Sequence, residues 1–146
     1  MRNFADKFQR YGQFTASEIK GLILTIVVVA FILSFRDWGK ETFDFFYGLS
    51  HFFLTIILVA IAFLARQLAH RASALSVGYK VEFRAWTVGL VVGLILSFVS
   101  NGTIPLLATG GIFVTHLAVH RLGRFRYGLG YHVVGWIALA GAIANI

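Results

Sequence analysis

The stretch FFYGLSHFFLTIILVAIAFLA, residues 45–65, decides the class of the fold because none of its 21 positions is Lys, Arg, Asp or Glu. About 20 apolar residues in a helix cross the roughly 30 Å hydrocarbon core of a bilayer. The rest of the chain is similar, since 58% of its 146 residues are hydrophobic and 13% are charged. Soluble domains have roughly 45–50% and 25%. This composition excludes a soluble enzyme, a disordered chain and a nucleic-acid-binding domain.

Further uncharged stretches predict the remaining membrane segments. Gly21–Phe35 is the first of them, and the segment extends back to residue 16, because Thr15-Ala16-Ser17-Glu18 fits a capping box that starts a helix there. The uncharged stretch 85–120 is too long for one pass and is broken at 101–105, so we expect a pair of limbs that enters and returns. Residues 128–146 form the last segment. The sequence thus predicts an all-α polytopic membrane protein with about four segments.

The returning limb has its own composition. Gly110 and Gly111 are followed by Ile112, Phe113 and Val114, which suits a short β element or a re-entrant segment. The pattern does not decide whether residues 106–120 are helix or strand. On the entering limb, small residues at helical spacing predict a helix-packing face. These small residues are Gly89, Gly93 and Ser97.

Basic residues predict the orientation in the membrane. Lys and Arg number 13 against six Asp and Glu, a formal net charge of +7. Cytoplasmic loops carry the excess of Lys and Arg. All but two of the basic residues share one side if the N-terminus is cytoplasmic and 85–120 returns. We therefore expect a multi-pass protein of the cell membrane, with anionic lipid headgroups as partners.

The first 15 residues form a separate N-terminal arm. Their aromatic residues at positions 4, 8 and 11 share a helical face, and basic residues lie between them. This pattern is typical of a helix that lies on the bilayer surface. We therefore divide the chain into an interfacial arm, 1–15, and a transmembrane domain, 16–146. The chain has no cysteine, which excludes disulfides and thiolate metal sites.

Five segments carry a family resemblance: Phe14–Leu22, Phe63–Arg71, Gly78–Arg84, Ala108–Val114 and Ala140–Ile146. In this order they resemble the site-2 protease family of intramembrane zinc metalloproteases, in particular its archaeal-type branch. The last segment is similar to the family's A-G-P-x-x-N-I motif, with Ala142 in place of proline. The resemblance implies that a substrate or partner binds at the edge strand, Gly110–Val114, and at Asn145. For Asn145, a helix-packing role is the alternative.

The zinc motif of that family is degenerate in this chain. H-E-x-x-H binds zinc through two His residues on one helix face, and its Glu handles the proton of the bound water. Here Arg66 takes the place of the first His, Gln67 takes the place of the Glu, and His70 remains. Arginine cannot lose its proton to bind a metal, and an amide is no base. The family's third ligand is an aspartate on a later helix, which the sequence, ending at Ile146, does not reach. We expect no catalytic residue and no cofactor.

Other interpretations of these residues stay open. Arg66, His70 and Arg71 could form the basic cap of the second helix, at the level of the lipid headgroups. His70 could hold a metal with His116 or His120, which would make the chain an active zinc metalloprotease with a rearranged site. The sequence could also belong to an architectural subunit of a membrane complex, or be a fragment.

The favoured hypothesis is a non-catalytic relative that binds or scaffolds another membrane protein or a transmembrane segment. Its mechanism would be strand addition at Gly110–Val114. Glu82, between Lys80 and Arg84, is expected to make a local ion pair.

Overall fold

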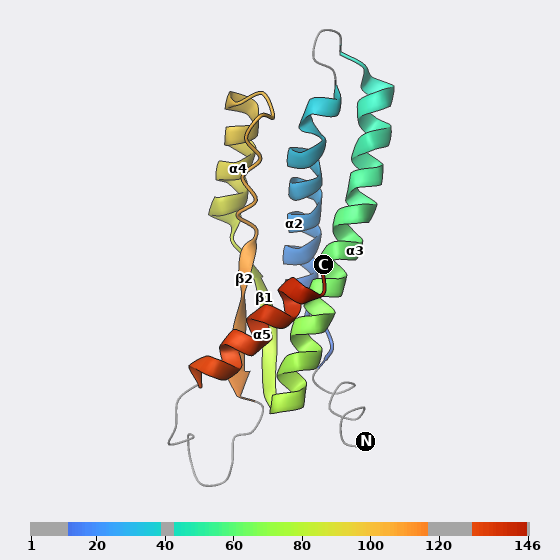
Figure 1. The fold of residues 1–146 in the computed structure, drawn as a ribbon. Coiled ribbons are helices and arrows are strands. Elements are labelled where there is room, and N and C mark those ends of the chain that lie inside the picture. Colours follow the sequence, from blue (N-terminus) through green and yellow to red (C-terminus); the bar gives the residue numbers. More distant parts are fainter. Residues whose placement is uncertain (1–11, 39–42, 117–129, 146) are drawn as a thin grey trace. The chain divides into compact units, whose positions relative to one another are not determined.

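A computed structural model describes residues 12–38, 43–116 and 130–145 (Figure 1). The described chain is mostly helical. Its elements are α2 (Ala16–Ser34), η1 (Phe35–Trp38), α3 (Phe45–Val77), β1 (Tyr79–Ala85), α4 (Thr87–Val99), β2 (Gly110–His116) and α5 (Tyr131–Ile143). Most of the expected interfacial arm, together with His120 and the basic residues that follow it, lies outside the described residues.

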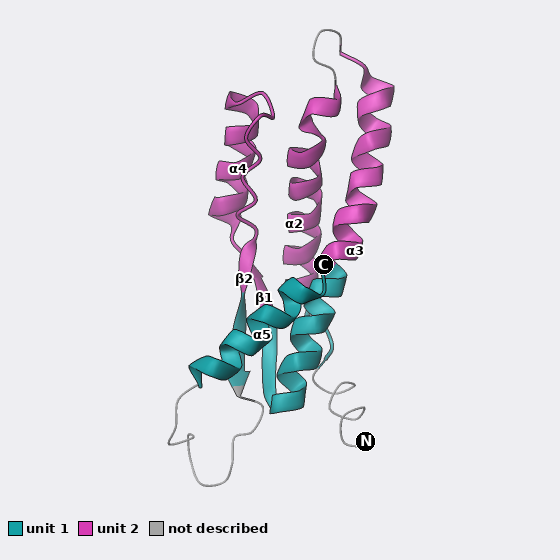
Figure 2. Cartoon of the chain, viewed as in Figure 1, with its two compact units in different colours: residues 1–15, 64–82, 112–146 teal, residues 16–63, 83–111 magenta. Residues whose placement is uncertain are grey.

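The chain divides into two compact units (Figure 2). The first unit consists of residues 1–15, 64–82 and 112–146, and the second of residues 16–63 and 83–111. The second unit contains α2, most of α3 and α4, and the first unit contains the end of α3, α5 and most of the sheet. Each unit has its own buried core.

Two helical stretches are long and apolar enough to cross a bilayer. They are Ala16–Trp38 and Phe45–Val77, with mean hydropathies of 2.2 and 2.3 in their most apolar windows. In the most apolar part of α3 only 11% of the residues are buried. Large apolar side chains such as Phe46 and Ile61 are 82% and 61% exposed. A helix in a soluble core would bury such side chains. These helices indicate that the protein associates with a membrane.

The two later apolar helices are shorter than expected. α4 and α5 have 13 residues each, which corresponds to about 20 Å. This is less than the hydrocarbon core of a bilayer, which is about 30 Å thick. Among the described residues, two helices rather than four are therefore long enough to span.

Helix α3 continues well beyond the expected segment 45–65 and ends at Val77. Gly78, with φ of 85°, follows as the left-handed residue that stops the helix and turns the chain into β1. At 33 residues the helix is about 50 Å long. It is therefore longer than a bilayer core requires, and residues 64–77 belong to the first unit.

The chain returns after α4, as the sequence predicts, but in extended form. Asn101 and Gly102, with φ of 50° and 69°, reverse its direction. Residues 104–109 then run beside α4, and the strand β2 begins at Gly110 (Figure 1). The open question about 106–120 is therefore answered for its described part, which is extended chain and strand up to His116.

The small residues of α4 face this returning segment. A Cβ on Gly89 would meet the carbonyl oxygen and the Cβ of Ala108, and a Cβ on Gly93 would overlap the carbonyl oxygen of Leu106. Ser97 is fully buried. The closest neighbours of the two glycines therefore include backbone of an extended chain, which can approach a helix closely where Cβ atoms are missing.

The strands β1 and β2 form a two-stranded antiparallel sheet, which an all-α fold does not include. Trp86 N–H donates to the Thr109 carbonyl at 3.2 Å near one end of the sheet. At the other end the Thr115 hydroxyl donates to the Lys80 carbonyl at 3.4 Å. The strands therefore run in opposite directions.

The sequence analysis missed strand β1, although the chain carried a signal for it. Tyr79, Val81 and Phe83 alternate with charged residues, the two-residue period of a half-buried strand. Val81 and Phe83 are 2% and 4% exposed. The expected ion pair is present, because Lys80 Nζ lies 2.9 Å from Glu82 Oε1.

A buried carboxylate connects α2 to β1 in the second unit. Glu18, in the first turn of α2, is 4% exposed and accepts the backbone N–H of Phe83 at 2.9 Å. The helix begins at Ala16, where the capping pattern predicts. The sequence analysis assigned Glu18 to the cap and gave no sign that its side chain reaches a residue 65 positions away.

The glycine contacts of α4 predict that Gly93→Ala destabilises the protein by about 1–3 kcal/mol, since the new methyl group must displace the backbone carbonyl of Leu106. Gly111→Ala is the matched control, because nothing lies within 4 Å of its Cβ position. Unfolding of both variants in detergent micelles measures the difference. Equal stability of the two variants would contradict the close approach.

Candidate functional site

The part of α3 that belongs to the first unit contains Arg66, Gln67 and His70. Gln67, His70 and Arg71 share one helix face at spacings of three and four residues. Each of the three is 2% exposed, whereas Arg66 is exposed. The basic-cap interpretation is therefore wrong for His70 and Arg71. Both are buried in protein, and α3 continues past them to Val77.

The imidazole of His70 is held by helix α5. Its Nδ1 lies 2.7 Å from the carbonyl oxygen of Ile137. Because a carbonyl only accepts, Nδ1 carries the proton and donates, which leaves the lone pair on Nε2 in the neutral ring. The opposite edge of the ring lies against Gly141, where an added Cβ would overlap Nε2 and Cε1. Both ring nitrogens therefore face α5.

These residues do not fit a catalytic zinc ion. Such a site takes three protein ligands and an open position for water. Arg66 offers a fixed positive charge, Gln67 offers an amide, and Nε2 of His70 is covered by Gly141. Across residues 12–38, 43–116 and 130–145, no group of three His, Asp or Glu side chains could hold a metal ion.

The buried amide of Gln67 places no charge in the interior of the first unit. Its Oε1 is buried and accepts no hydrogen bond from any described residue. A carboxylate at the same place would be a buried negative charge, which costs far more than a neutral amide unless a cation balances it. The amide therefore fits a site without a metal.

Of the other predicted site residues, Ile112 and Val114 pack against the core cluster that contains Ile137, whose carbonyl His70 contacts. Gly110–Val114 lie in β2, and Asn145 is exposed just beyond the end of α5. His116 is the last described residue of β2, and its proposed partner His120 lies outside the described residues.

Arg71 makes a buried contact that the sequence analysis missed. One guanidinium nitrogen, Nη1, donates to the carbonyl oxygens of Gly12 and Gln13 at 3.3 and 3.2 Å. The guanidinium carbon lies 3.9 Å from the centre of the Phe14 ring, in cation–π geometry. Arg71 thus fixes residues 12–14 on α3. No local pattern could show this, since the partners are nearly 60 positions apart.

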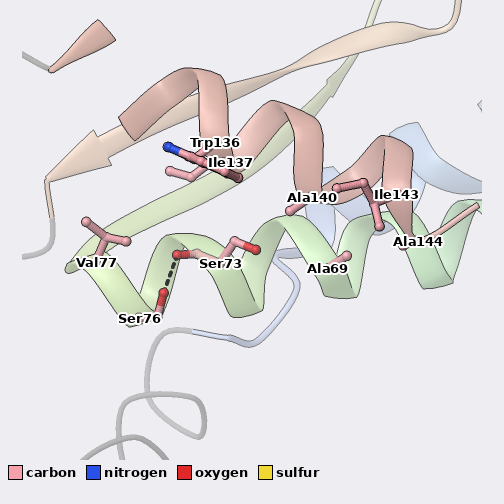
Figure 3. A pocket seen from close by; sticks show the side chains of 9 residues that line it. All are labelled: Ala69, Ser73, Ser76, Val77, Trp136, Ile137, Ala140, Ile143 and Ala144. Atoms are coloured by element: carbon pink, nitrogen blue, oxygen red, sulfur yellow. Dashed lines mark hydrogen bonds between the residues drawn. The ribbon is translucent and has the colours of Figure 1, made fainter. Parts of the chain in front are cut away.

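An apolar cavity of about 510 Å³ lies between α3 and α5 in the first unit (Figure 3). Ala69, Ser73 and Val77 line it from α3, and Trp136 and Ala140 are among its α5 residues. The Ser76 hydroxyl bonds to the carbonyl of Ser73 in its own helix. The cavity has no charged lining residue, so it offers no group for acid–base or metal chemistry.

Comparisons with known proteins agree with a distant relationship to metalloproteases. No family model matches the sequence, and no solved structure matches it. A protein of Methanocaldococcus jannaschii named "Putative zinc metalloprotease MJ0611" is 29% identical over 136 residues, which cover 92% of this chain. The chain spans 59% of the length of that relative. The similarity supports a metalloprotease-like relationship for the chain.

The geometry around Arg71 predicts that Arg71→Lys lowers the free energy of unfolding by about 1–3 kcal/mol, because an ammonium loses the planar contact with Phe14 and part of the carbonyl bonding. Arg66→Lys is the matched control on the same helix. Arg66 is exposed, so the expected change is within about 0.5 kcal/mol. Denaturant unfolding of both variants compares them, and a neutral Arg71→Lys would contradict the anchoring role.

Proposed function

We propose that the chain is a multi-pass membrane protein of site-2-protease-like descent that binds an extended segment of another membrane protein without cutting it. Its N-terminus is cytoplasmic in this proposal, and its scaffold is retained while the zinc chemistry is lost. The order of five matching segments supports the descent, and the relative from Methanocaldococcus jannaschii supports the metalloprotease-like relationship.

One observation supports the proposed loss of catalysis. Zinc hydrolysis needs a metal-bound water beside a general base. The remaining motif histidine, His70, has its Nδ1 at the Ile137 carbonyl and its Nε2 against Gly141. No ion can reach Nε2 while α5 lies there, and Gln67 supplies no base.

The binding surface is the free edge of the returning chain. The backbone N–H of Leu107 makes no hydrogen bond within the described part of the chain, whereas the carbonyls of Leu106 and Ala108 lie against Gly93 and Gly89 of α4. Leu106 and Leu107 are 40% and 46% exposed. Backbone polar groups in contact with lipid need a partner. An extended segment laid along 104–109 and β2 would supply it by adding a strand.

The register of the sheet specifies how such a strand would bind. The bond from Trp86 to Thr109 orients the Thr109 backbone toward β1. With the two-residue period of a strand, the backbone groups of Ile112 and Val114 then point to the opposite, outer edge. Gly111 has open space at its Cβ position. This edge can therefore accept main-chain hydrogen bonds with little steric hindrance.

The proposal predicts that the purified protein in nanodiscs contains less than about a tenth of an equivalent of zinc, since catalytic metals are bound stoichiometrically. It also predicts no cleavage of a bilayer-embedded peptide, with or without added zinc. Elemental analysis and mass spectrometry of the peptide measure the two quantities. Cleavage that a chelator stops, and that His70→Ala abolishes, would refute the proposal.

A second test concerns the edge itself. A photo-crosslinking residue at Gly111 or Leu107 is expected to give a discrete adduct with one and the same membrane protein in native membranes. The same residue at Phe53, 58% exposed on α3, is the control and should react with lipid only. Sequencing of the adducts should place the crosslink in an extended segment of the partner. Equal labelling from all three positions, or none from the edge, would contradict strand addition.

A further inference from the structure

The attachment of α5 to α3 depends on very few side chains. Only Ile137 and Gly141 are buried among the residues of α5. They are one helical turn apart, and both contact the same residue, His70. Ile137 also packs against Ala74 and Val81 in the core of the first unit. The cavity of Figure 3 borders this contact, so α5 is not packed along its whole length.

The side chain of His70 packs into a small depression on the surface of α5. The missing Cβ of Gly141 makes the space for the edge of the ring that carries Nε2 and Cε1. On the other edge of the ring, the hydrogen bond to the Ile137 carbonyl fixes the rotation of the imidazole. Shape and hydrogen bonding therefore select one position of α5 on α3.

The ring keeps the orientation that a metal ligand would have. Histidine ligands commonly donate one N–H to a backbone carbonyl and present the other nitrogen to the metal. Here the N–H donation to a carbonyl is present with Ile137, and a Cβ added at Gly141 would overlap the other ring nitrogen, Nε2. The backbone of α5 therefore covers the nitrogen that a metal ligand would present.

We propose that His70 is a positioning residue that docks helix α5, and that α5 is its partner in place of a metal ion. The proposal goes beyond client binding, because the docking would persist in a chain that has no client. It explains why a histidine is compatible with a site whose other two motif positions are Arg66 and Gln67.

The docking is measured by the distance between α3 and α5. The chain has no cysteine, so spin labels can be placed at two introduced ones, Ser76→Cys and Leu139→Cys, which are exposed positions. Pulsed electron paramagnetic resonance in nanodiscs should give one narrow distance distribution. His70→Ala should broaden it, whereas His70→Asn should keep it, because the amide N–H replaces Nδ1–H.

Changing the sizes of both contacting residues distinguishes loss of the His70–Gly141 contact from a general loss of folding. Gly141→Ala alone should broaden the distribution, since its methyl group overlaps the His70 ring. In the double variant His70→Ala/Gly141→Ala the overlap is gone, so the distribution should become narrower than in Gly141→Ala. Gly135→Ala, on the same helix with open space at its Cβ position, is the control and should change nothing.

Adding zinc tests whether His70 contacts helix α5 or binds a metal ion. A millimolar excess should leave the distance distribution of the labelled chain unchanged. A His70-dependent shift on zinc addition would overturn the proposal, and so would an unchanged distribution in both His70→Ala and Gly141→Ala. Failure of the crosslinking test at Gly111 would leave these distances unaffected, so the two proposals fail separately.

Discussion

The contact between one imidazole and one helix organises the first unit. His70 reaches the Ile137 carbonyl with one nitrogen and the surface of Gly141 with the other, and these are the only buried residues of α5. A metal ion would need the same nitrogen and the same space. Helix docking and metal binding at His70 are therefore mutually exclusive. The absence of a base at Gln67 agrees with helix docking.

The inward face of α3 shows how polar residues are accommodated inside this unit. His70 and Arg71 both bond to backbone carbonyls, of α5 and of residues 12–14 respectively. Buried polar groups need such partners, because an unmet hydrogen bond in protein or lipid costs free energy. The two residues thereby attach α5 and residues 12–14 to one helix, so this face of α3 connects distant parts of the chain.

In the second unit, backbone groups are accommodated by the glycines of a helix and by one acidic side chain. The glycines of α4 allow extended backbone to approach, and Glu18 satisfies the N–H of Phe83. The backbone N–H of Leu107 has no hydrogen-bond partner in the described chain. An unpaired backbone group next to lipid favours an added strand. This is the physical basis for the proposed strand addition.

The sequence by itself determined the apolar character of α2 and α3, the start of α2 at Ala16 and the return after α4. These features depend on composition and local patterns, which can be recognised within a short stretch of sequence. It missed β1 and overestimated the lengths of the later helices. Only the tertiary structure decided the roles of His70, Arg71 and Glu18, because their partners lie 57 to 67 positions away. Burial and partner choice at such separations arise from packing, which local periodicity does not encode.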